Sequence, residues 1–255
     1  MKPYYDRGGI TIFHGDCREI LGRLEPETFD LVCADPPYGD TELDWDSRDL
    51  SWLRLSDRLL KRSGTVWCFG SMRMFLAQAA EVGIWWRIAQ DLVWEKHNGS
   101  SFHADRFRRV HEHIVQWYRH TTRWNDVYKN PVMEMGATAR RVHRKRRPRH
   151  LGDIGAGHFA AVEGGPKMMR SVIYARSCHG HAVHPTQKPR EVVRPLLTYS
   201  CPPGGIVLDP TMGSGTALVV AQELGLRAVG IEIDEAMCRQ AVDRLSQVSL
   251  LAGAR

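Results

Sequence analysis

One continuous stretch near the C-terminus restricts the fold more than any other, "VLDPTMGSGTALVVAQELGLRAVGIEID" (residues 207–234). Residues 205–209 are predicted to form a buried strand, residues 216–224 a helix, and residues 228–233 a second strand that contains an acid. Two strands joined by a helix run parallel, and parallel strands need helices on both faces of their sheet. This segment therefore predicts an α/β fold with a mostly parallel, doubly wound sheet.

The same alternation of short apolar strands and helices covers most of the remaining chain. We expect the other strands at residues 10–13, 29–34, 64–69, 85–93 and 111–118, and the other helices at residues 17–24, 50–60, 72–82, 189–199 and 235–245. The alternation fades between residues 119 and 180, which are rich in Arg, Lys, His and Gly. We therefore predict two halves of one structural domain, residues 1–118 and 181–255, separated by a small insertion, residues 119–180.

The turn after the first strand of residues 207–234 carries a pair of glycines. Gly213 and Gly215 allow the backbone to turn tightly and to approach a ligand closely. Glu232 ends the next strand, where a carboxylate can accept hydrogen bonds from ribose hydroxyls. Leu218 occupies the place of the third glycine of the dinucleotide fingerprint, and a pyrophosphate needs the complete cradle. A nucleoside without phosphates needs only the close turn and the acid, and S-adenosylmethionine is such a nucleoside.

A second stretch, "VCADPPYGD" (residues 32–40), ends an apolar strand with an acid, two prolines and an aromatic residue. The prolines lack N–H groups and fix φ, so the chain leaves the sheet in a stiff, extended turn. Asp35 and the carbonyl of Pro36 can accept both N–H groups of adenine's exocyclic amine, which frees the nitrogen lone pair for a methyl donor. Tyr38 offers a flat face to an extruded base. The predicted catalytic residues are Asp35, Pro36, Pro37 and Tyr38.

With these two motifs in this order, the chain resembles the amino-methyltransferases of DNA, specifically their permuted β group. In that group the catalytic tetrapeptide comes first and the glycine loop last. Three stretches carry the resemblance further: "FHGDCREILGRLEPETFDLVCADPPYG" (13–39), "VWEKHNGSSFHADRFRRVHEHIVQWYR" (93–119) and "HPTQKP" (184–189). The resemblance covers nearly the whole chain outside residues 119–180. It implies a Rossmann-like methyltransferase fold with a small target-recognition insertion.

The resemblance also implies where the methyl donor, S-adenosylmethionine, binds. The residue at the position of Asp16 contacts the donor's adenine. Thr186, Gln187 and Lys188 lie near the donor's carboxylate, to which Lys188 supplies the opposite charge. The complete set of predicted donor-binding residues is Asp16, Cys17, His184, Thr186, Gln187, Lys188, Asp209, Gly213, Ser214, Gly215, Thr216 and Glu232.

The predicted insertion contains a dense basic run, "RRVHRKRRPRH" (residues 140–150). Such a run repels itself and resists folding into a core, and phosphate contacts are its obvious use. The net charge of +6 agrees with a polyanionic partner. Because the resemblance places target recognition here, we expect double-stranded DNA as the partner. The predicted DNA-binding residues are Arg140, Arg141, Arg144, Lys145, Arg146, Arg147 and Arg149.

The sequence thus predicts a DNA methyltransferase that modifies adenine N6 in double-stranded DNA after flipping the base. Asp35 favours adenine because enzymes of the cytosine-N4 type more often carry Ser at that place. Two alternatives stay open: a cytosine-N4 methyltransferase, and a catalytically dead DNA-binding protein with the same fold. The second is mildly favoured by Thr211, which stands where the family usually has Phe, and Ala217 replaces a common Thr. A methyltransferase that acts on protein glutamine would carry Asn in place of Asp35.

The remaining features restrict the setting of the protein. The six cysteines form no Cys-x-x-Cys pair, and no run approaches the ~20 apolar residues of a membrane span, so we expect a reduced, cytoplasmic protein. Cysteine and histidine gather in "SCHGHAVH" (177–184), yet the spacing fits no common zinc pattern, and we expect no metal. The resemblance is consistent with a homodimer and a restriction-modification setting. The sequence identifies neither the recognition site nor a restriction partner.

Overall fold

The computed structural model describes residues 1–40, 46–99, 104–144, 157–178 and 187–253. These residues form two compact units. The larger combines Met1–Asn130 with Ser171–Arg255, and the smaller is Pro131–Arg170. The smaller unit lies inside the predicted insertion but is shorter than it, because residues on both of its sides belong to the larger unit.

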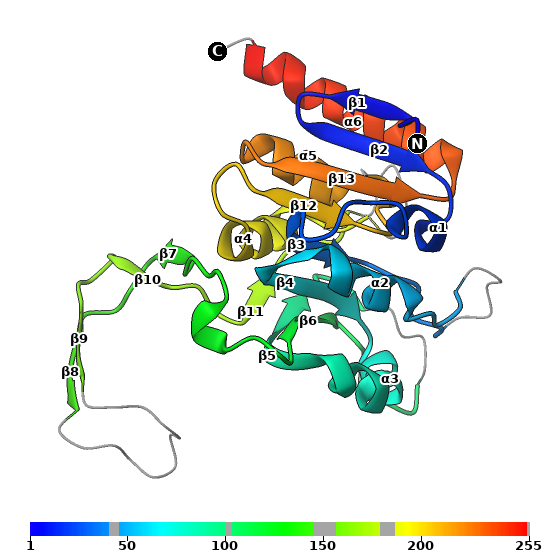
Figure 1. Cartoon of the computed structure of the whole chain (residues 1–255). Coiled ribbons are helices and arrows are strands. Elements are labelled where there is room, and N and C mark those ends of the chain that lie inside the picture. The colour runs from blue at the N-terminus through cyan, green and yellow to red at the C-terminus, as the bar shows by residue number, and fades with distance from the viewer. Residues whose placement is uncertain (41–45, 100–103, 145–156, 179–186, 254–255) are drawn as a thin grey trace. The chain divides into compact units, whose positions relative to one another are not determined.

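The larger unit is built on a nine-stranded sheet with the order β1-β2-β13-β12-β3-β4-β6-β5-β11 (Figure 1). The strands are β1 (Tyr5–Arg7), β2 (Ile10–His14), β3 (Phe29–Ala34), β4 (Leu60–Gly70), β5 (Trp86–Glu95), β6 (His111–Arg119), β11 (Val172–Tyr174), β12 (Ile206–Asp209) and β13 (Arg227–Glu232). Five adjacent strands, from β2 through β13, β12 and β3 to β4, run parallel, whereas β6 runs antiparallel to both of its neighbours. The predicted α/β class with a mostly parallel sheet is confirmed.

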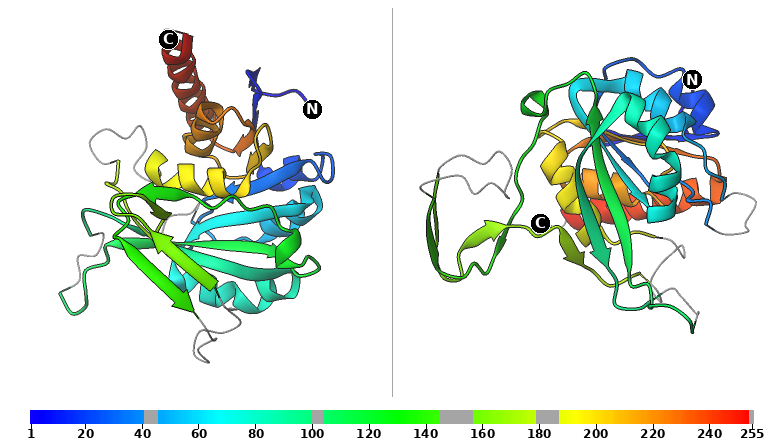
Figure 2. Two further views of the ribbon diagram at one scale, coloured as in Figure 1. Left: turned by 90° about the vertical axis from the view of Figure 1, so that its left-hand side faces the viewer. Right: turned by 90° about the horizontal axis from the view of Figure 1, so that it is seen from below.

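Helices cover both faces of this sheet, as the view from below in Figure 2 shows. They are α1 (Cys17–Leu21), α2 (Ser51–Leu59), α3 (Met72–Trp85), α4 (Arg190–Ser200), α5 (Thr216–Glu223) and α6 (Glu235–Gly253), with a short 3-10 helix at Trp124–Asp126. Helices α4, α5 and α6 form one layer, and α1, α2 and α3 lie on the opposite face. Ser71 caps the start of α3 by accepting a hydrogen bond from the backbone N–H of Met74. The doubly wound arrangement is thus also confirmed.

The smaller unit consists of two antiparallel ribbons. The strands are β7 (Met133–Met135), β8 (Arg140–Arg144), β9 (Gly157–Ala161) and β10 (Pro166–Met168), in the pairs β7 with β10 and β8 with β9. Most of its described side chains are exposed, because two-stranded ribbons this short bury little of their own surface. Within the described ranges of the whole chain, no helix is both long enough and apolar enough to cross a membrane.

The central strands are held in a register that brings their carboxyl ends together. Leu208 of β12 lies opposite Val32 of β3, so the two strands end within a residue or two of each other. The buried carboxylate of Asp30 strengthens this pairing, because it accepts a hydrogen bond of 2.9 Å from the backbone N–H of Ile206. In a parallel sheet, this shared edge is where ligands bind.

Candidate functional site

Four loops that follow parallel strands meet at the carboxyl edge of the sheet. They follow β2, β13, β12 and β3, which are consecutive neighbours in the sheet. The register places Glu232 opposite His14 and Gly230 opposite Asp209. The two motifs that the sequence places far apart in the chain therefore follow adjacent strands at one edge.

The glycine loop after β12 turns through two left-handed residues. Gly213 has φ of 51° and Gly215 has φ of 75°, a region that residues with a Cβ rarely adopt. A Cβ at Gly215 would also approach the Cβ of Ala241 in α6 to 2.8 Å. The N–H of Gly213 donates to Glu232 Oε2 at 2.8 Å, so the acid at the end of β13 already contacts the loop. Both glycines are thus required by the backbone, and one of them lies beside the predicted ribose acceptor.

A buried arginine of α6, which was not among the predicted site residues, forms hydrogen bonds with the glycine loop. Arg244 of α6 is 5% exposed, and its Nη1 donates to the carbonyl of Ser214 at 2.6 Å, to Ser214 Oγ at 2.9 Å and to Thr216 Oγ1 at 3.2 Å. Burial, together with the nearby charge of Arg190, lowers the pKa of Arg244 to about 10. In the sequence, Arg244 could have been recognised as unusual because it lies on the apolar face of α6, between the buried residues Ala241 and Leu245.

Asp16 and Cys17 lie at the end of β2, beside the end of β13. Asp16 caps α1 by accepting a hydrogen bond of 2.8 Å from the backbone N–H of Arg18. Its hydrogen bonds to the Arg18 side chain lower its pKa. The N–H of Gly15 donates to the carbonyl of Glu232 at 2.8 Å, which holds this loop against the acid of β13. Asp16 and Glu232, two of the three carboxylates predicted to bind the donor, therefore lie beside each other at the ends of neighbouring strands.

The turn after β3, residues 35–38, contains the predicted catalytic residues and is called the catalytic turn below. Side chains from the segment that follows it hold it in place. Pro36 is buried, and the Tyr38 hydroxyl donates to Asp35 Oδ1 at 2.8 Å. Arg48 Nε donates to the carbonyl of Tyr38 at 2.8 Å, and the N–H of Gly39 donates to Asp46 Oδ1 at 2.7 Å. The turn is thus fixed by its prolines and by contacts on both sides of the backbone.

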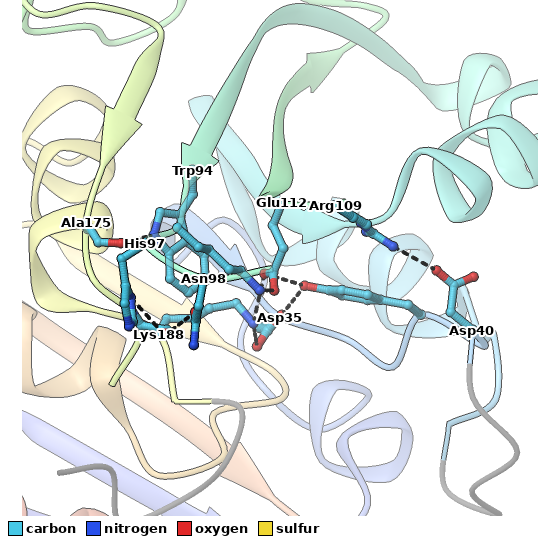
Figure 3. Close-up of polar contacts among 12 residues, drawn as sticks. Asp35, Asp40, Trp94, His97, Asn98, Arg109, Glu112, Ala175 and Lys188 are labelled. Carbon is cyan, nitrogen blue, oxygen red and sulfur yellow. Dashed lines mark hydrogen bonds and ion pairs between the residues drawn. The ribbon is translucent and has the colours of Figure 1, made fainter. Parts of the chain in front are cut away.

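Three further charged residues complete the site around Asp35 (Figure 3). Lys188, which lies just before α4, places its ammonium 2.5 Å from Asp35 Oδ2 and 3.5 Å from Glu112 Oε2. Glu112 lies in the second position of β6 and also forms an ion pair with Lys96. The resemblance placed Lys188 near the donor's carboxylate, and the structure pairs it with Asp35 and Glu112. Neither Glu112 nor Lys96 was predicted from the sequence. Each is a single charged residue next to or inside an apolar strand, and that position alone does not indicate a functional site.

The charges of this cluster stabilise one another. Burial lowers the pKa of Lys188, but the nearby carboxylates of Asp35 and Glu112 outweigh it and raise the pKa overall. Burial raises the pKa of Glu112, but Lys188 and Lys96 outweigh it and lower the pKa overall. Burial, Asp35 and Glu112 all raise the pKa of Tyr38. At neutral pH the site therefore holds ionised Glu112, a cationic Lys188 and a neutral tyrosine.

Asp209, at the end of β12, has a different environment. It is 6% exposed, and burial raises its pKa well above the ordinary value of 3.8, although a hydrogen bond from the N–H of Thr211 opposes the shift. The charges of Asp35 and Glu232 raise the pKa further. These influences favour its neutral form, which can donate as well as accept a hydrogen bond.

The other predicted residues fall into three groups. Gln187 lies beside Lys188 in the described chain, whereas His184 and Thr186 lie outside the described residues, as do Lys145, Arg146, Arg147 and Arg149. Arg140 and Arg141 are exposed on β8, and Arg144 ends that strand. No group of metal-ligating side chains occurs among the described residues, and the histidines of "SCHGHAVH" lie outside them.

Comparisons with known proteins agree with this geometry. A family model for DNA methylase, covering N6 and N4 methyltransferases, matches residues 29–243. The chain is 26% identical to the type II methyltransferase M2.DpnII of Streptococcus pneumoniae, over 96% of this chain and 92% of the relative. It is 24% identical to M2.LlaDCHI of Lactococcus lactis subsp. cremoris, over 96% of this chain and 93% of the relative.

Solved structures show the same fold. The M1.HpyAVI–SAM complex is 22% identical, with a TM-score of 0.65 over 92% of this chain and 100% of that one. The cytosine-N4-specific PvuII DNA methyltransferase is 14% identical, with a TM-score of 0.69 over 97% of this chain and 93% of that one. The family match spans most of the chain, including both the catalytic turn and the glycine loop. The chain therefore belongs to the N6/N4 family of DNA methylases.

Proposed function

We propose that this protein transfers a methyl group from S-adenosylmethionine to N6 of adenine in double-stranded DNA, after the base has been flipped out. The observation that carries the proposal is the position of Asp35 and the glycine loop at the ends of adjacent parallel strands. A base held at Asp35 and a donor held at Gly213 would then meet at one edge of the sheet.

The residues around the glycine loop fit such a donor. The space where a Cβ of Gly213 would lie has no atom within 4 Å, and the carboxylate of Glu232 stands next to it. The hydroxyl of Thr211 is buried at the same loop without a hydrogen-bond partner in the described part of the chain. Asp16 and Glu232 would accept hydrogen bonds from the adenine and the ribose. Bound there, the donor supplies an electrophilic methyl group on a sulfonium.

The catalytic turn has the acceptors that an exocyclic amine needs. Asp35 and the carbonyl of Pro36 accept its two N–H groups, so the nitrogen becomes more tetrahedral and its lone pair forms the new N–C bond. The S–C bond breaks, and its electron pair stays on sulfur in S-adenosylhomocysteine. The nitrogen is cationic at that moment, so its proton leaves readily toward Asp35 or water. Tyr38 contributes a face for base stacking.

We place adenine before cytosine as the target because the turn begins with Asp35, whereas enzymes of the cytosine-N4 type more often carry Ser at that place. For either amine, Asp35 presents a charged oxygen beside a nitrogen that becomes cationic, an arrangement that stabilises the transition state electrostatically. Cytosine N4 is also an exocyclic amine and is the second candidate target. The basic ribbon formed by β8 and β9 supplies the phosphate contacts, as the exposed Arg140 and Arg141 suggest.

The test is Asp35→Ala, assayed by transfer of a tritiated methyl group to DNA and by calorimetric titration with S-adenosylmethionine. We expect transfer to be abolished and donor binding to be retained, because Asp35 contacts the base and not the donor. Asp91→Ala, an exposed acid of β5, is the matched control and keeps full activity. Nucleoside analysis of the methylated DNA identifies N6-methyladenine. Transfer by the Asp35 variant would refute the assignment, and N4-methylcytosine in the product would select the second candidate.

A further inference from the structure

Each of the two oxygens of Asp35 has a partner in the structure. Tyr38 donates to Oδ1 at 2.8 Å, and the ammonium of Lys188 lies 2.5 Å from Oδ2 (Figure 3). An incoming amine must bring its own N–H group to this carboxylate. During transfer its nitrogen also becomes cationic, and an ammonium on the same oxygen would then repel it. Each carboxylate oxygen can still accept a further hydrogen bond, but the nearby ammonium opposes the developing charge, so we expect a base to be methylated more readily when Lys188 has moved away from Oδ2.

The structure contains a second acceptor for both donors. The Tyr38 hydroxyl is 3.4 Å and the Lys188 ammonium 3.5 Å from one oxygen, Glu112 Oε2. Both distances exceed those of a good hydrogen bond, so each donor lies close to Asp35 and within a small rotation of Glu112. Lys96 pairs with the other oxygen, Oε1, and keeps this carboxylate facing the site.

The charge balance of the cluster supports an exchange of this kind. Two carboxylates, Asp35 and Glu112, face two ammonium groups, Lys96 and Lys188. The side chains of Glu112 and Lys96 are each 15% exposed and that of Lys188 is 10% exposed. A buried ammonium that leaves one carboxylate must reach another, because a buried charge without a partner is strongly unfavourable. Glu112 is the acceptor at the required distance.

We propose that Glu112 is a positioning residue that takes over Lys188 and Tyr38 when the target amine binds to Asp35. The inference rests on the proposed role of Asp35 as the acceptor for an exocyclic amine. It gives Lys188 two places, on Asp35 before the base enters and on Glu112 afterwards. When the flipped base binds, the ion pair of Lys188 with Asp35 is thus replaced by an ion pair of Lys188 with Glu112.

The test is a double-mutant cycle of Glu112→Gln and Lys188→Met in the full-length protein. With glutamine at position 112, Lys188 has Asp35 as its one carboxylate and continues to mask it. We expect kcat/KM for DNA to fall about 10- to 100-fold, the range of one charge-assisted hydrogen bond. In the Lys188→Met background no ammonium masks Asp35 and the Tyr38 hydroxyl alone still contacts it, so we expect the same change to cost less than about threefold. Donor affinity, measured by calorimetry, is the same with and without Glu112→Gln.

The controls separate this mechanism from simple damage to the fold. Glu95→Gln removes an exposed carboxylate from the neighbouring strand β5, and we expect activity to be unchanged. If Glu112→Gln does not fold, Glu112→Asp withdraws the carboxylate by one methylene and should show a smaller loss that Lys188→Met again suppresses. Equal losses in both backgrounds would overturn the positioning role. A wild-type protein that transfers no methyl group, or an active Asp35→Ala variant, would instead show that the proposed function has failed.

Discussion

The hydrogen bonds between Arg244 of α6 and the glycine loop should contribute measurably to the free energy of unfolding. Arg244 makes hydrogen bonds to one buried carbonyl and two hydroxyls, of Ser214 and Thr216. In Arg244→Met the hydroxyls can turn to other acceptors, but the carbonyl of Ser214 stays buried without a donor. A buried polar group without a partner costs about 1–3 kcal/mol, and each lost bond to a charged donor about 1.5–3 kcal/mol.

Part of this loss is returned. Burial lowers the pKa of Arg244 to about 10, which means that its charged form is held at a cost that methionine does not have. Taking the unsatisfied carbonyl and one lost bond, less this relief, we expect the free energy of unfolding to fall by about 2 kcal/mol. For a chain of this size that lowers the melting temperature by roughly 4–8 °C. Ser214 and Thr216 flank Gly215, so the loop should also loosen and the affinity for S-adenosylmethionine should fall several-fold.

Differential scanning calorimetry and donor titration measure the two effects in one preparation. Arg239→Met is the matched control, because Arg239 lies on the same helix and is 68% exposed, with one weak ion pair to Glu235. It should change the melting temperature by little, since exposed ion pairs contribute about 0–1 kcal/mol. If the two variants melt at the same temperature and bind the donor equally well, the reasoning about Arg244 is wrong.

Three further predictions concern other parts of the molecule. Thr211→Val removes a buried hydroxyl that has no hydrogen-bond partner in the described part of the chain, so the protein without donor should have a higher melting temperature. If that hydroxyl binds the donor, the same change lowers the affinity for S-adenosylmethionine. Calorimetry measures both quantities. Glu112 has a pKa below its ordinary value of 4.5, so the stability it contributes is present above that pH and is lost as the pH falls through the lowered pKa. Urea unfolding between pH 7 and pH 3 should therefore show a smaller acid dependence in Glu112→Gln. Arg140→Ala with Arg141→Ala should weaken binding to DNA of any sequence and reduce the slope of log K against log salt by roughly 1.8, for two phosphate contacts.

The sequence was sufficient to predict the sheet and to place both motifs after strands. Apolar periodicity locates the central strands, and the rule that parallel strands end at one edge places Asp35 and Gly213 at the same edge, but that their strands are neighbours comes from the strand order of the structure. The sequence does not reveal β11, because three residues, Val172–Tyr174, are too few to show a period. On the C-terminal side of Pro131–Arg170, this short strand is the element that ties the chain to the larger unit.

The charged partners of Asp35 could not be predicted in the same way. Glu112 belongs to β6 and Lys96 follows β5, and neither stands in a turn whose chemistry is visible locally. Glu112 comes to the site through a contact across 74 residues of chain, with the Tyr38 hydroxyl, that becomes visible only when strands are paired. Arg244 could have been predicted in part. A charged residue on the apolar face of a helix can be recognised in the sequence, whereas its hydrogen-bond partners cannot.

The topology nevertheless explains why these particular residues meet. Because β6 runs antiparallel to β4, its first residues lie at the edge where the parallel strands end, and Glu112 is the second residue of β6. Helix α4 leads back to the start of β12, so its N-terminus, and with it Lys188, lies at the same edge. The cluster thus collects the ends of parallel strands, the start of an antiparallel strand and the start of a helix. The charges of this cluster come from different elements and pair with one another, so a substitution that changes one of them should be compensated by another on a different element, not by its neighbours in the sequence.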